Sequence, residues 1–340
     1  MVLAFDKFAG TLSAAEVSAA AADGWRSRRE YDDLVHRPMS DGGPGFLEAV
    51  ASGAQAPRWI EVEVADPLGR PVGARLLVDG DTAWVESAQA CGLHLLTSEE
   101  RDPERTSSRG VGELLRAALP ETPRRVVVGV GGTATNDGGR GLLEVIDSWP
   151  DGVALEVATD VDNPLLGING ASAVFGPQKG ADPSAVQRLD AQLSAWVDEL
   201  GAQEVAARPG AGAGGGLGFA LMRLGAQRVS GVDTVIAATG LGEQIEGSDL
   251  VLTGEGSFDF TSLRGKVVSG VARAALDVGV PCVVIAGQAS VGRREAMANG
   301  VVASYSLADL AGSAQAAMAE AAQWARVAGE RVAAAWGHGA

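Results

Sequence analysis

The sequence contains few cysteines and histidines, and their placement excludes two classes of site. Cys91 and Cys282 show no CxxC spacing, so neither a disulfide framework nor a cysteine zinc site is predicted. His36, His94 and His338 are scattered and offer no metal-ligand spacing. No apolar run approaches the ~20 residues of a membrane helix, and the N-terminus lacks the pattern of a signal peptide. We therefore expect a cytoplasmic protein.

Positive charge is also scarce. The chain has 27 Lys and Arg against 43 Asp and Glu, a net charge of −16, which argues against binding to nucleic acid or to an anionic membrane. An anionic ligand therefore has to be held by a local cationic pocket. The three lysines, Lys7, Lys179 and Lys266, all lie beside glycine-rich segments. A slim ammonium fits a narrow phosphate site better than a guanidinium does, although chance and compositional bias against lysine are the alternative.

The chain is long enough for about two domains. Short apolar runs alternate with helical patterns near both ends of the chain: MVLAF, LVHRPM, SDLVLTG, PCVVIAG and VVASYSL. This alternation predicts a parallel α/β layer, in which ligands bind at the carboxyl ends of the strands. Asp6, Asp41, Glu255 and Asp259 lie at such ends, where a loop carboxylate can also be an ordinary turn former.

The middle of the chain has a different pattern. Residues 59–88 alternate apolar and polar side chains around two turn sequences, which predicts antiparallel hairpins. We therefore expect a Rossmann-like domain of residues 1–58 and 245–340, interrupted by a mixed α/β domain of residues 59–244, with the active site in the cleft. Residues 308–336 are expected to form one amphipathic helix that packs on the core.

A glycine-rich loop, GVGGTATNDGG, follows the apolar run RRVVV. Gly131 and Gly132 can bring backbone N–H groups close to a ligand. The neighbouring polar side chains could contact an anion or its metal: Thr133, Thr135, Asn136 and Asp137. A plain connecting loop is the alternative. GVGGTA fits the dinucleotide-binding fingerprint, but the acidic residue that belongs to this fingerprint is missing. The Walker A and GxSxG motifs are absent.

Two more segments carry groups suited to phosphoryl transfer. TGEGSFDFTSLRGK places Glu255, Arg264 and Lys266 in a loop and at a helix start, where anions are favoured. DVDNPLLG adds Asp160 and Asn163 at a further strand end. Phosphoryl transfer needs backbone donors, cations and carboxylates for Mg²⁺, and these segments supply all three.

Six segments occur in the order seen in the type I bacterial glycerate kinases, which the chain resembles over residues ~3 to ~290: DKFAGTLSAAE, PMSDGGPGF, GGTATNDGGRG, DVDNPLLGINGASAVFGPQKGA, GAGAGGGLG and TGEGSFDFTSLRGK. The resemblance implies ATP-dependent phosphorylation of D-glycerate, usually at the 2-hydroxyl, in a two-domain α/β protein. The positions that match the family's motifs are Asp6, Asp41, Thr133, Asn136, Asp137, Asp160, Lys179, Glu255 and Lys266.

On this basis we assign roles to the candidate site residues. The catalytic group is Asp160, Lys266, Arg264 and Lys7; the substrate-binding group is Asp6, Asp41, Asn163 and Lys179. The nucleotide-binding group is Gly131, Gly132, Thr133, Thr135, Asn136 and Asp137, and Mg²⁺ is assigned to Asp160 and Glu255. ATP and D-glycerate are the expected partners of a monomer or homodimer.

The sequence departs from the family's usual residues at Ala9, Pro44 and Thr261. Substrate preference is therefore open to drift. Two other functions stay open: a kinase for another small hydroxyacid or sugar acid, and a non-catalytic binding protein on a kinase fold. The full set of carboxylates argues against the second, because a pure binding protein has no need of a Mg²⁺ site.

Overall fold

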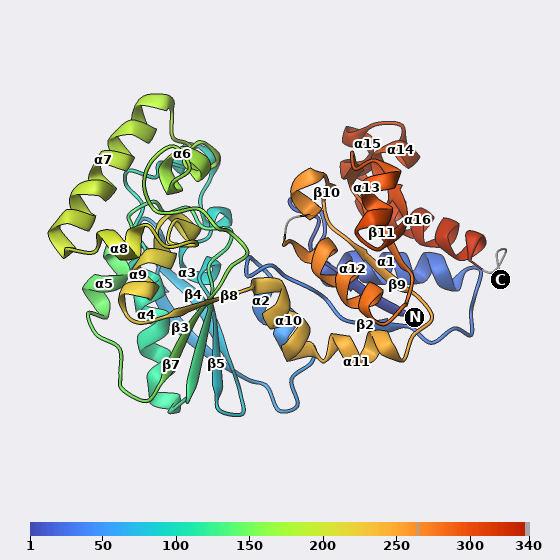
Figure 1. Ribbon diagram of the computed structural model, residues 1–340, viewed down its shortest axis with the longest axis horizontal. Helices are drawn as coiled ribbons and strands as arrows, with labels where there is room; N and C mark the ends of the chain where they lie inside the picture. The colour runs from blue at the N-terminus through green and yellow to red at the C-terminus, as the bar shows by residue number, and fades with distance from the viewer. Residues whose placement is uncertain (264, 337–340) are drawn as a thin grey trace. The chain divides into compact units, whose positions relative to one another are not determined.

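The computed structural model describes residues 1–263 and 265–336 (Figure 1). The chain forms two compact units. The first unit contains Met1–Asp41, Glu48–Gly53 and the chain from Val232 onward, and the second contains Gly42–Leu47 and Ala54–Gly231. Arg264, assigned above to catalysis, lies outside the described residues.

The first unit is built on a parallel five-stranded sheet in the order β13-β11-β9-β1-β2. Its strands are β1 (Val2–Phe5), β2 (Val35–His36), β9 (Val251–Gly254), β11 (Cys282–Ala286) and β13 (Val301–Ser306). A small pair, β10 (Ser257–Phe258) and β12 (Gln288–Ala289), is also parallel. β1, β9 and β11 are buried throughout, as expected for parallel strands covered on both faces. The five apolar runs were therefore correctly predicted as parallel strands.

Close helix packing covers this sheet. The helices of the first unit are α1 (Ala14–Arg26), α2 (Phe46–Ala51, which begins in the second unit), α10 (Gly231–Thr239), α11 (Leu241–Glu246), α12 (Val267–Asp277), α13 (Arg293–Ala298), α14 (Leu307–Ala311), α15 (Ala314–Ala319) and α16 (Ala321–Ala335). α1 begins with a capping box between Ser13 and Glu16. It lies beside α16 (Figure 1), where a Cβ at Gly24 would collide with the backbone of α16. The glycine thus permits the approach that buries Trp25.

The prediction of one helix over residues 308–336 is wrong. Three helices occupy this region: α14 (Leu307–Ala311), α15 (Ala314–Ala319) and α16 (Ala321–Ala335). Gly312 adopts a positive φ of 85° after α14, and the Ser313 side chain caps α15. A glycine followed by a capping serine ends one helix and starts another, although the apolar periodicity continues. The predicted core packing is confirmed for α16, which buries Ala325, Ala328 and Val332.

The second unit contains a mixed six-stranded sheet in the order β3-β4-β5-β6-β7-β8. Its strands are β3 (Arg58–Ala65), β4 (Pro71–Asp79), β5 (Thr82–Glu86), β6 (Arg125–Gly129), β7 (Ala154–Ala158) and β8 (Gln227–Val229). β3, β4 and β5 pair antiparallel, which confirms the predicted hairpins. β5 to β8 run parallel, so their carboxyl ends meet at one edge.

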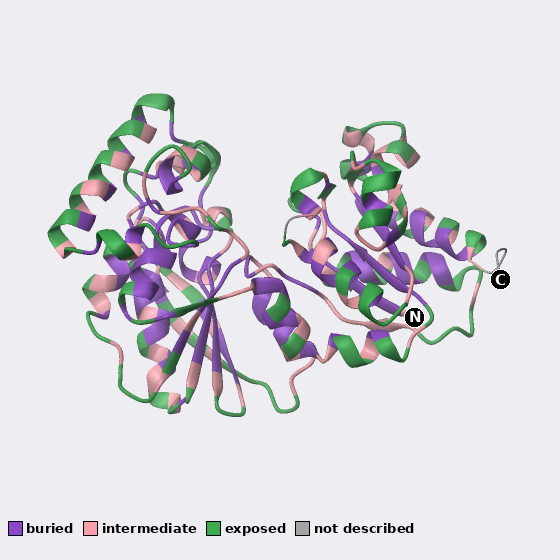
Figure 2. Cartoon of the chain, viewed as in Figure 1, coloured by how far each residue is buried: buried purple, intermediate pink, exposed green. Residues whose placement is uncertain are grey.

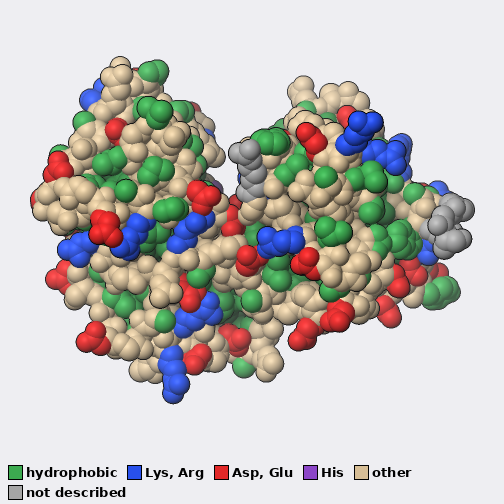
Figure 3. Space-filling model, viewed as in Figure 1, with side chains coloured by type: hydrophobic (Ala, Val, Ile, Leu, Met, Phe, Trp, Pro, Cys, Tyr) green, Lys and Arg blue, Asp and Glu red, His purple; other side chains and the backbone are tan. Residues whose placement is uncertain are grey.

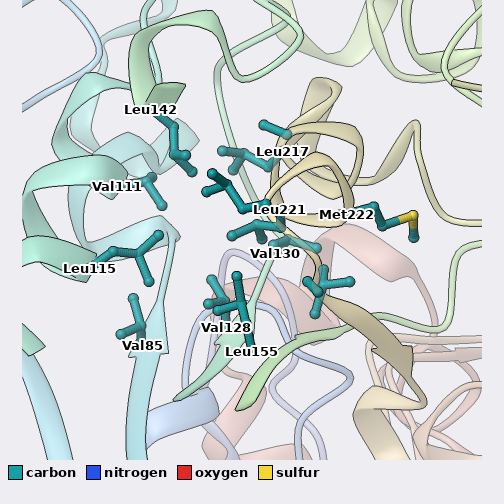
Figure 4. Close-up of a cluster of buried hydrophobic side chains, with 14 of the residues drawn as sticks. Val85, Val111, Leu115, Val128, Val130, Leu142, Leu155, Leu217, Leu221 and Met222 are labelled. Carbon is teal, nitrogen blue, oxygen red and sulfur yellow. The ribbon is translucent and has the colours of Figure 1, made fainter. Parts of the chain in front are cut away.

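Helices enclose this second sheet and complete its core. They are α3 (Ala88–Cys91), α4 (Arg109–Ala118), α5 (Arg140–Val145), α6 (Ala171–Phe175), α7 (Pro183–Leu200), α8 (Gln203–Ala206) and α9 (Leu217–Arg223). Leu115, Val128 and Leu221 are among the side chains that gather between strands and helices (Figure 4). The central strands of both sheets are largely buried, the edge strands β3 and β8 are mostly exposed or half-buried, and the outer helix faces are exposed (Figure 2). The predicted α/β class, with a Rossmann-like parallel sheet and a mixed sheet, is confirmed.

None of the helices in the described part of the chain is long and apolar enough to cross a membrane.

The boundary between the two units differs from the predicted domain boundary. α11 and nearly all of α10 belong to the first unit, whereas the sequence placed residues up to 244 in the interrupting domain.

Candidate active site

In the first unit, the carboxyl ends of two neighbouring strands bring predicted site residues together. β1 and β9 pair in parallel with Phe5 opposite Gly254, so the next residues, Asp6 and Glu255, leave the same edge of the sheet. The Asp6 backbone N–H donates to Gly254 O at 2.9 Å, which continues the strand register one residue further. The prediction that these two carboxylates share an edge is therefore confirmed.

Lys7 joins two of the carboxylates in this cluster. Its Nζ lies 3.4 Å from Asp6 Oδ1 and 3.9 Å from Asp41 Oδ1, and its backbone N–H donates to Asp6 Oδ1 at 2.7 Å. Burial raises the pKa of the Asp6 carboxyl to about 6; Lys7 opposes this shift, and the charge of Asp41 adds to it. Lys7 therefore stabilises the ionised form of a carboxyl that burial tends to neutralise.

Glu255 is buried with an unsatisfied oxygen. The residue is 8% exposed, its Oε1 has no hydrogen-bond partner in the described part of the chain, and Lys266 Nζ lies 4.0 Å from its Oε2. Burial raises the pKa of the Glu255 carboxyl to about 7. A hydrogen bond with the Ser262 side chain and the charge of Lys266 oppose this shift, and the charges of Asp6 and Asp41 add to it. Lys266 also occupies the N-cap position of α12, where the helix favours anions.

These carboxylates suit Mg²⁺, which proteins commonly hold with one or two carboxylates while phosphates and water complete the coordination. The unsatisfied Glu255 oxygen, with Asp6 on the neighbouring strand end, matches that donor type. No cluster of three or more His, Cys, Asp or Glu side chains arranged for a metal occurs within residues 1–263 and 265–336. The residues thus fit a metal held jointly with a phosphorylated ligand.

The glycine-rich loop follows β6 in the second unit, and its glycines accommodate another segment of the chain. Gly131 N donates to Gly42 O at 3.0 Å, and a Cβ at Gly131 would lie 2.5 Å from Gly43 Cα. Gly132 has a φ of +70°, and a Cβ there would lie 2.5 Å from Pro44 Cδ. The close backbone approach expected for a ligand is thus made by residues 42–44, and a ligand contact at Gly131 and Gly132 stays a prediction.

Lys179 lies against this loop. It is 5% exposed, and its Nζ donates to Thr135 O at 2.5 Å and to Thr133 Oγ1 at 3.3 Å. Burial lowers the pKa of Lys179 to about 8, which Cys91 and Asp137 oppose. The sequence assigned Lys179 to glycerate and the threonines to the nucleotide, but the structure places all three in one constellation.

Two further polar groups of the loop are buried without complete hydrogen bonding. Among the described residues, Thr135 Oγ1 and Asn136 Oδ1 lack a hydrogen-bond partner, whereas Asn136 Nδ2 donates to Ser172 Oγ at 2.9 Å. Buried polar atoms are normally satisfied, so these two offer hydrogen bonds to a ligand or a water molecule.

Asp137 organises the loop. Its Oδ2 accepts hydrogen bonds from Ser108 N and Ser108 Oγ, both at 2.8 Å, and from Gly141 N at 3.1 Å. Its Oδ1 accepts from Gly139 N at 3.0 Å. Four donors from the loop and from the starts of α4 and α5 occupy the carboxylate, which favours a structural role over the predicted contact with the nucleotide.

Asp160 and Asn163 follow β7 but do not join the Lys179 constellation through any hydrogen bond between described residues. Asp160 Oδ1 accepts from Ser230 Oγ at 2.7 Å and from Gly231 N at 3.1 Å, at the start of α10. Asn163 Nδ2 donates to Asn169 O at 2.8 Å. Asp160 belongs to the second unit and Glu255 to the first, so the assigned pair of metal ligands is divided between the two units.

Sequence reasoning missed Glu86, the last residue of β5. It is 2% exposed, and its Oε2 accepts from Gly45 N at 3.1 Å and Leu47 N at 3.3 Å. Glu86 thereby ties the segment 42–47 to the end of β5. A carboxylate at the end of an apolar strand was the signal that identified Glu255, and it would have identified Glu86 too.

Comparisons with known proteins identify the family of the chain. A family model described as "Glycerate kinase family" matches residues 1–148 and 143–337. The chain is 38% identical over 346 residues to a glycerate kinase of Halalkalibacterium halodurans, covering 90% of each protein. It is 39% identical over 326 residues to the glycerate 2-kinase of Escherichia coli (strain K12), covering 84% of each. A crystal structure from Salmonella typhimurium LT2, described as a glycerate kinase 2, covers 98% of this chain and 97% of its own, with a TM-score of 0.75 and 36% identity. The chain therefore belongs to the glycerate kinase family.

Proposed function

We propose that this protein transfers the γ-phosphoryl group of ATP to the 2-hydroxyl of D-glycerate, forming 2-phosphoglycerate and ADP in a Mg²⁺-dependent reaction in the cytoplasm. The observation that supports it best is the pair of buried carboxylates, Asp6 and Glu255, with lysines beside them at the carboxyl ends of β1 and β9. Family membership supports glycerate as the acceptor, and the name of the Escherichia coli relative supports the 2-hydroxyl.

In this proposal the first unit handles the transferred group. Asp6 and Glu255 would hold Mg²⁺, which would neutralise phosphate charge. Lys266, at the start of α12 beside Glu255, contacts the transferred phosphoryl group. Lys7 keeps Asp6 ionised and orients it together with Asp41. Arg264 remains assigned beside Lys266 on the sequence motif alone.

The second unit binds the remaining anionic oxygens. The loop of residues 131–137 and Lys179 supply neutral and cationic donors, which suits a phosphate or a carboxylate. Asp160 is bonded to the start of α10, which supports a positioning role for it. The catalytic and metal roles assigned to Asp160, and the substrate contact assigned to Asn163, stay predictions, as does the placement of the active site in a cleft.

An ADP-release assay with a panel of small hydroxyacids tests the proposal. We expect turnover with ATP and D-glycerate, loss of turnover on chelation of Mg²⁺, and recovery when Mg²⁺ is restored. Phosphorus NMR of the product distinguishes 2-phosphoglycerate from 3-phosphoglycerate. Turnover of another hydroxyacid in place of glycerate would reject glycerate as the substrate but would support the kinase activity. Binding of the substrates without any turnover would reject the kinase activity.

A further inference from the structure

Lys179 is a buried ammonium whose hydrogen bonds go to neutral groups. Its acceptors are the Thr135 carbonyl oxygen and the Thr133 hydroxyl. Within the described chain, no carboxylate lies within the 4.0 Å of an ion pair with its Nζ. Burying a charge without a counter-charge is unfavourable, so an anionic ligand nearby would offset the cost.

Three segments fix the position of the ammonium. Lys179 ends the short 3-10 helix Pro177–Lys179, and its acceptors belong to the loop after β6. Gly215, from the third segment, lies close to the ammonium: a Cβ there would lie 2.8 Å from Lys179 Nζ and would collide with Thr135 O. Nζ therefore has little freedom to leave the two oxygens it contacts.

This geometry sets the direction of the Thr133 hydroxyl. An ammonium only donates, so Thr133 Oγ1 has to accept from Lys179, and its own hydrogen has to point elsewhere. Among the described residues, Thr133 Oγ1 has no second hydrogen-bond partner. Donation by a cation also polarises the hydroxyl and strengthens it as a donor.

We infer that Lys179 acts on a substrate through Thr133: the ammonium directs and polarises the hydroxyl, and the hydroxyl donates to an anionic oxygen of the substrate. Thr133 is then the contact residue, and Lys179 is a positioning residue. The identity of the substrates rests on the proposed function. The anionic oxygen comes from the ATP phosphates or from the glycerate carboxylate, and separate titrations distinguish the two.

A double-mutant cycle tests this coupling in the full chain. Affinities for a non-hydrolysable ATP analogue with Mg²⁺ and for D-glycerate are measured calorimetrically in Thr133→Val, Thr133→Ser, Lys179→Met and the double variant. We expect Thr133→Val to lose ~10- to ~100-fold in affinity for one of the two ligands, as for a hydrogen bond to a charged group. Thr133→Ser, which keeps the hydroxyl, should retain affinity within ~3-fold, and the double variant should bind no more than ~3-fold more weakly than Lys179→Met.

Thr239→Val is the matched control, since Thr239 is a buried threonine of the first unit whose hydroxyl donates to carbonyl oxygens of its own helix. It should bind both ligands as the wild type does. Equal affinity of Thr133→Val and Thr133→Ser for the ligand would overturn the inference. It would also be overturned if the fold-losses in affinity of the two single variants multiplied in the double variant. If Lys179→Met does not fold, the valine and serine variants still decide the outcome.

The same experiment separates this inference from the proposed function. Wild-type protein that binds the ATP analogue but does not phosphorylate glycerate would reject the function, while the cycle is still measured with the analogue. A wild-type protein that binds neither ligand would overturn both.

Discussion

Burial favours the uncharged form of three ionisable side chains: it raises the pKa values of Asp6 and Glu255 and lowers the pKa of Lys179. Asp6 and Glu255 directly follow a strand, and Lys179 ends a short 3-10 helix. Ionisable groups with shifted pKa values concentrate at functional sites, because catalysis and binding require them. The burial that causes these shifts also lowers stability. The residue scale is therefore where activity and stability are expected to oppose each other.

Replacing Glu255 with Gln should make this opposition measurable. The substitution removes a buried charge with an unsatisfied oxygen, so the ligand-free protein should melt about 2 °C higher or more in the presence of a chelator. Turnover should fall, because the amide is a poor ligand for Mg²⁺. A lower melting temperature would contradict the view that the ionised carboxyl strains the fold.

Lys266→Met should reduce turnover at least ~10²-fold, because one preorganised cation at developing charge contributes several kcal/mol. The fold should persist, since the Lys266 side chain is 40% exposed. Arg273→Met is the control: it removes a cation from the same helix whose partner is the exposed Asp233. Near-normal turnover in Lys266→Met, measured by ADP release, would exclude Lys266 from catalysis.

Lys179 gives stability a pH dependence of known sign. Its pKa falls from the ordinary lysine value of 10.5 to about 8 in the folded protein, so between these values the unfolded state binds more protons. The contribution of Lys179 to the free energy of unfolding therefore rises as the pH increases above about 8. Below about pH 8 the buried side chain is charged in the folded protein, and the full cost of burying that charge lowers stability. The Asp137 carboxylate and the Cys91 thiol, whose pKa is raised to about 12, are the titratable groups facing it.

Urea unfolding of the wild type and Lys179→Met at pH 7 and pH 9.5 checks this sign. Other titrating groups are common to both proteins, so the difference between them reports Lys179. We expect any stability advantage of the methionine variant to shrink at pH 9.5. A difference that is constant or grows with pH would contradict the expectation.

At the scale of elements, glycines determine how loops pack at the carboxyl edge of the second sheet. Gly42 has a φ of +94°, and a Cβ there would lie 2.5 Å from Ala158 O at the end of β7. Glu86 holds the same segment from β5. Segment 42–47 is thus fixed to the ends of three neighbouring strands, beside the loop that contains Thr133.

Gly42→Ala should accordingly destabilise the protein by more than Gly69→Ala. Both glycines have positive φ, but a Cβ at Gly69 meets nothing within 4 Å, so Gly69→Ala reports only the backbone strain of ~1–2 kcal/mol. Gly42→Ala should cost more and should also lower turnover, because it displaces the segment that packs on Gly131. Equal melting temperatures for the two variants would contradict the importance of this contact.

At the scale of the whole molecule, the net charge is −16. Acidic and basic side chains are interspersed on the face shown in Figure 3. The cations proposed to act on the substrates are few and tied to specific positions, so a general attraction for polyanions is not expected.

Division of the candidate residues between two units predicts a change on binding. If both units contact the substrates, ATP analogue, Mg²⁺ and glycerate together should reduce the radius of gyration, as lid closure does in other kinases. Small-angle scattering with each ligand alone and with all three measures this. An unchanged scattering curve in all conditions would reject a large closure.

Local sequence patterns determined much of this protein. Continuous apolar runs specified the buried parallel strands, and alternation interrupted by turn sequences specified the hairpins of residues 59–88. Carboxylates directly after β1 and β9 specified one edge of the site. These features depend on periodicity and on strand direction, which neighbouring residues carry.

Tertiary structure decided the rest. The bond from Lys179 to Thr133 joins residues 46 positions apart, and Asp160 reaches Ser230 across 70. Whether a loop carboxylate such as Asp137 faces a ligand or four backbone and hydroxyl donors depends on which segments fold against it. No local pattern contains that information, because it arises when distant segments compete for the same hydrogen-bonding groups and the same space.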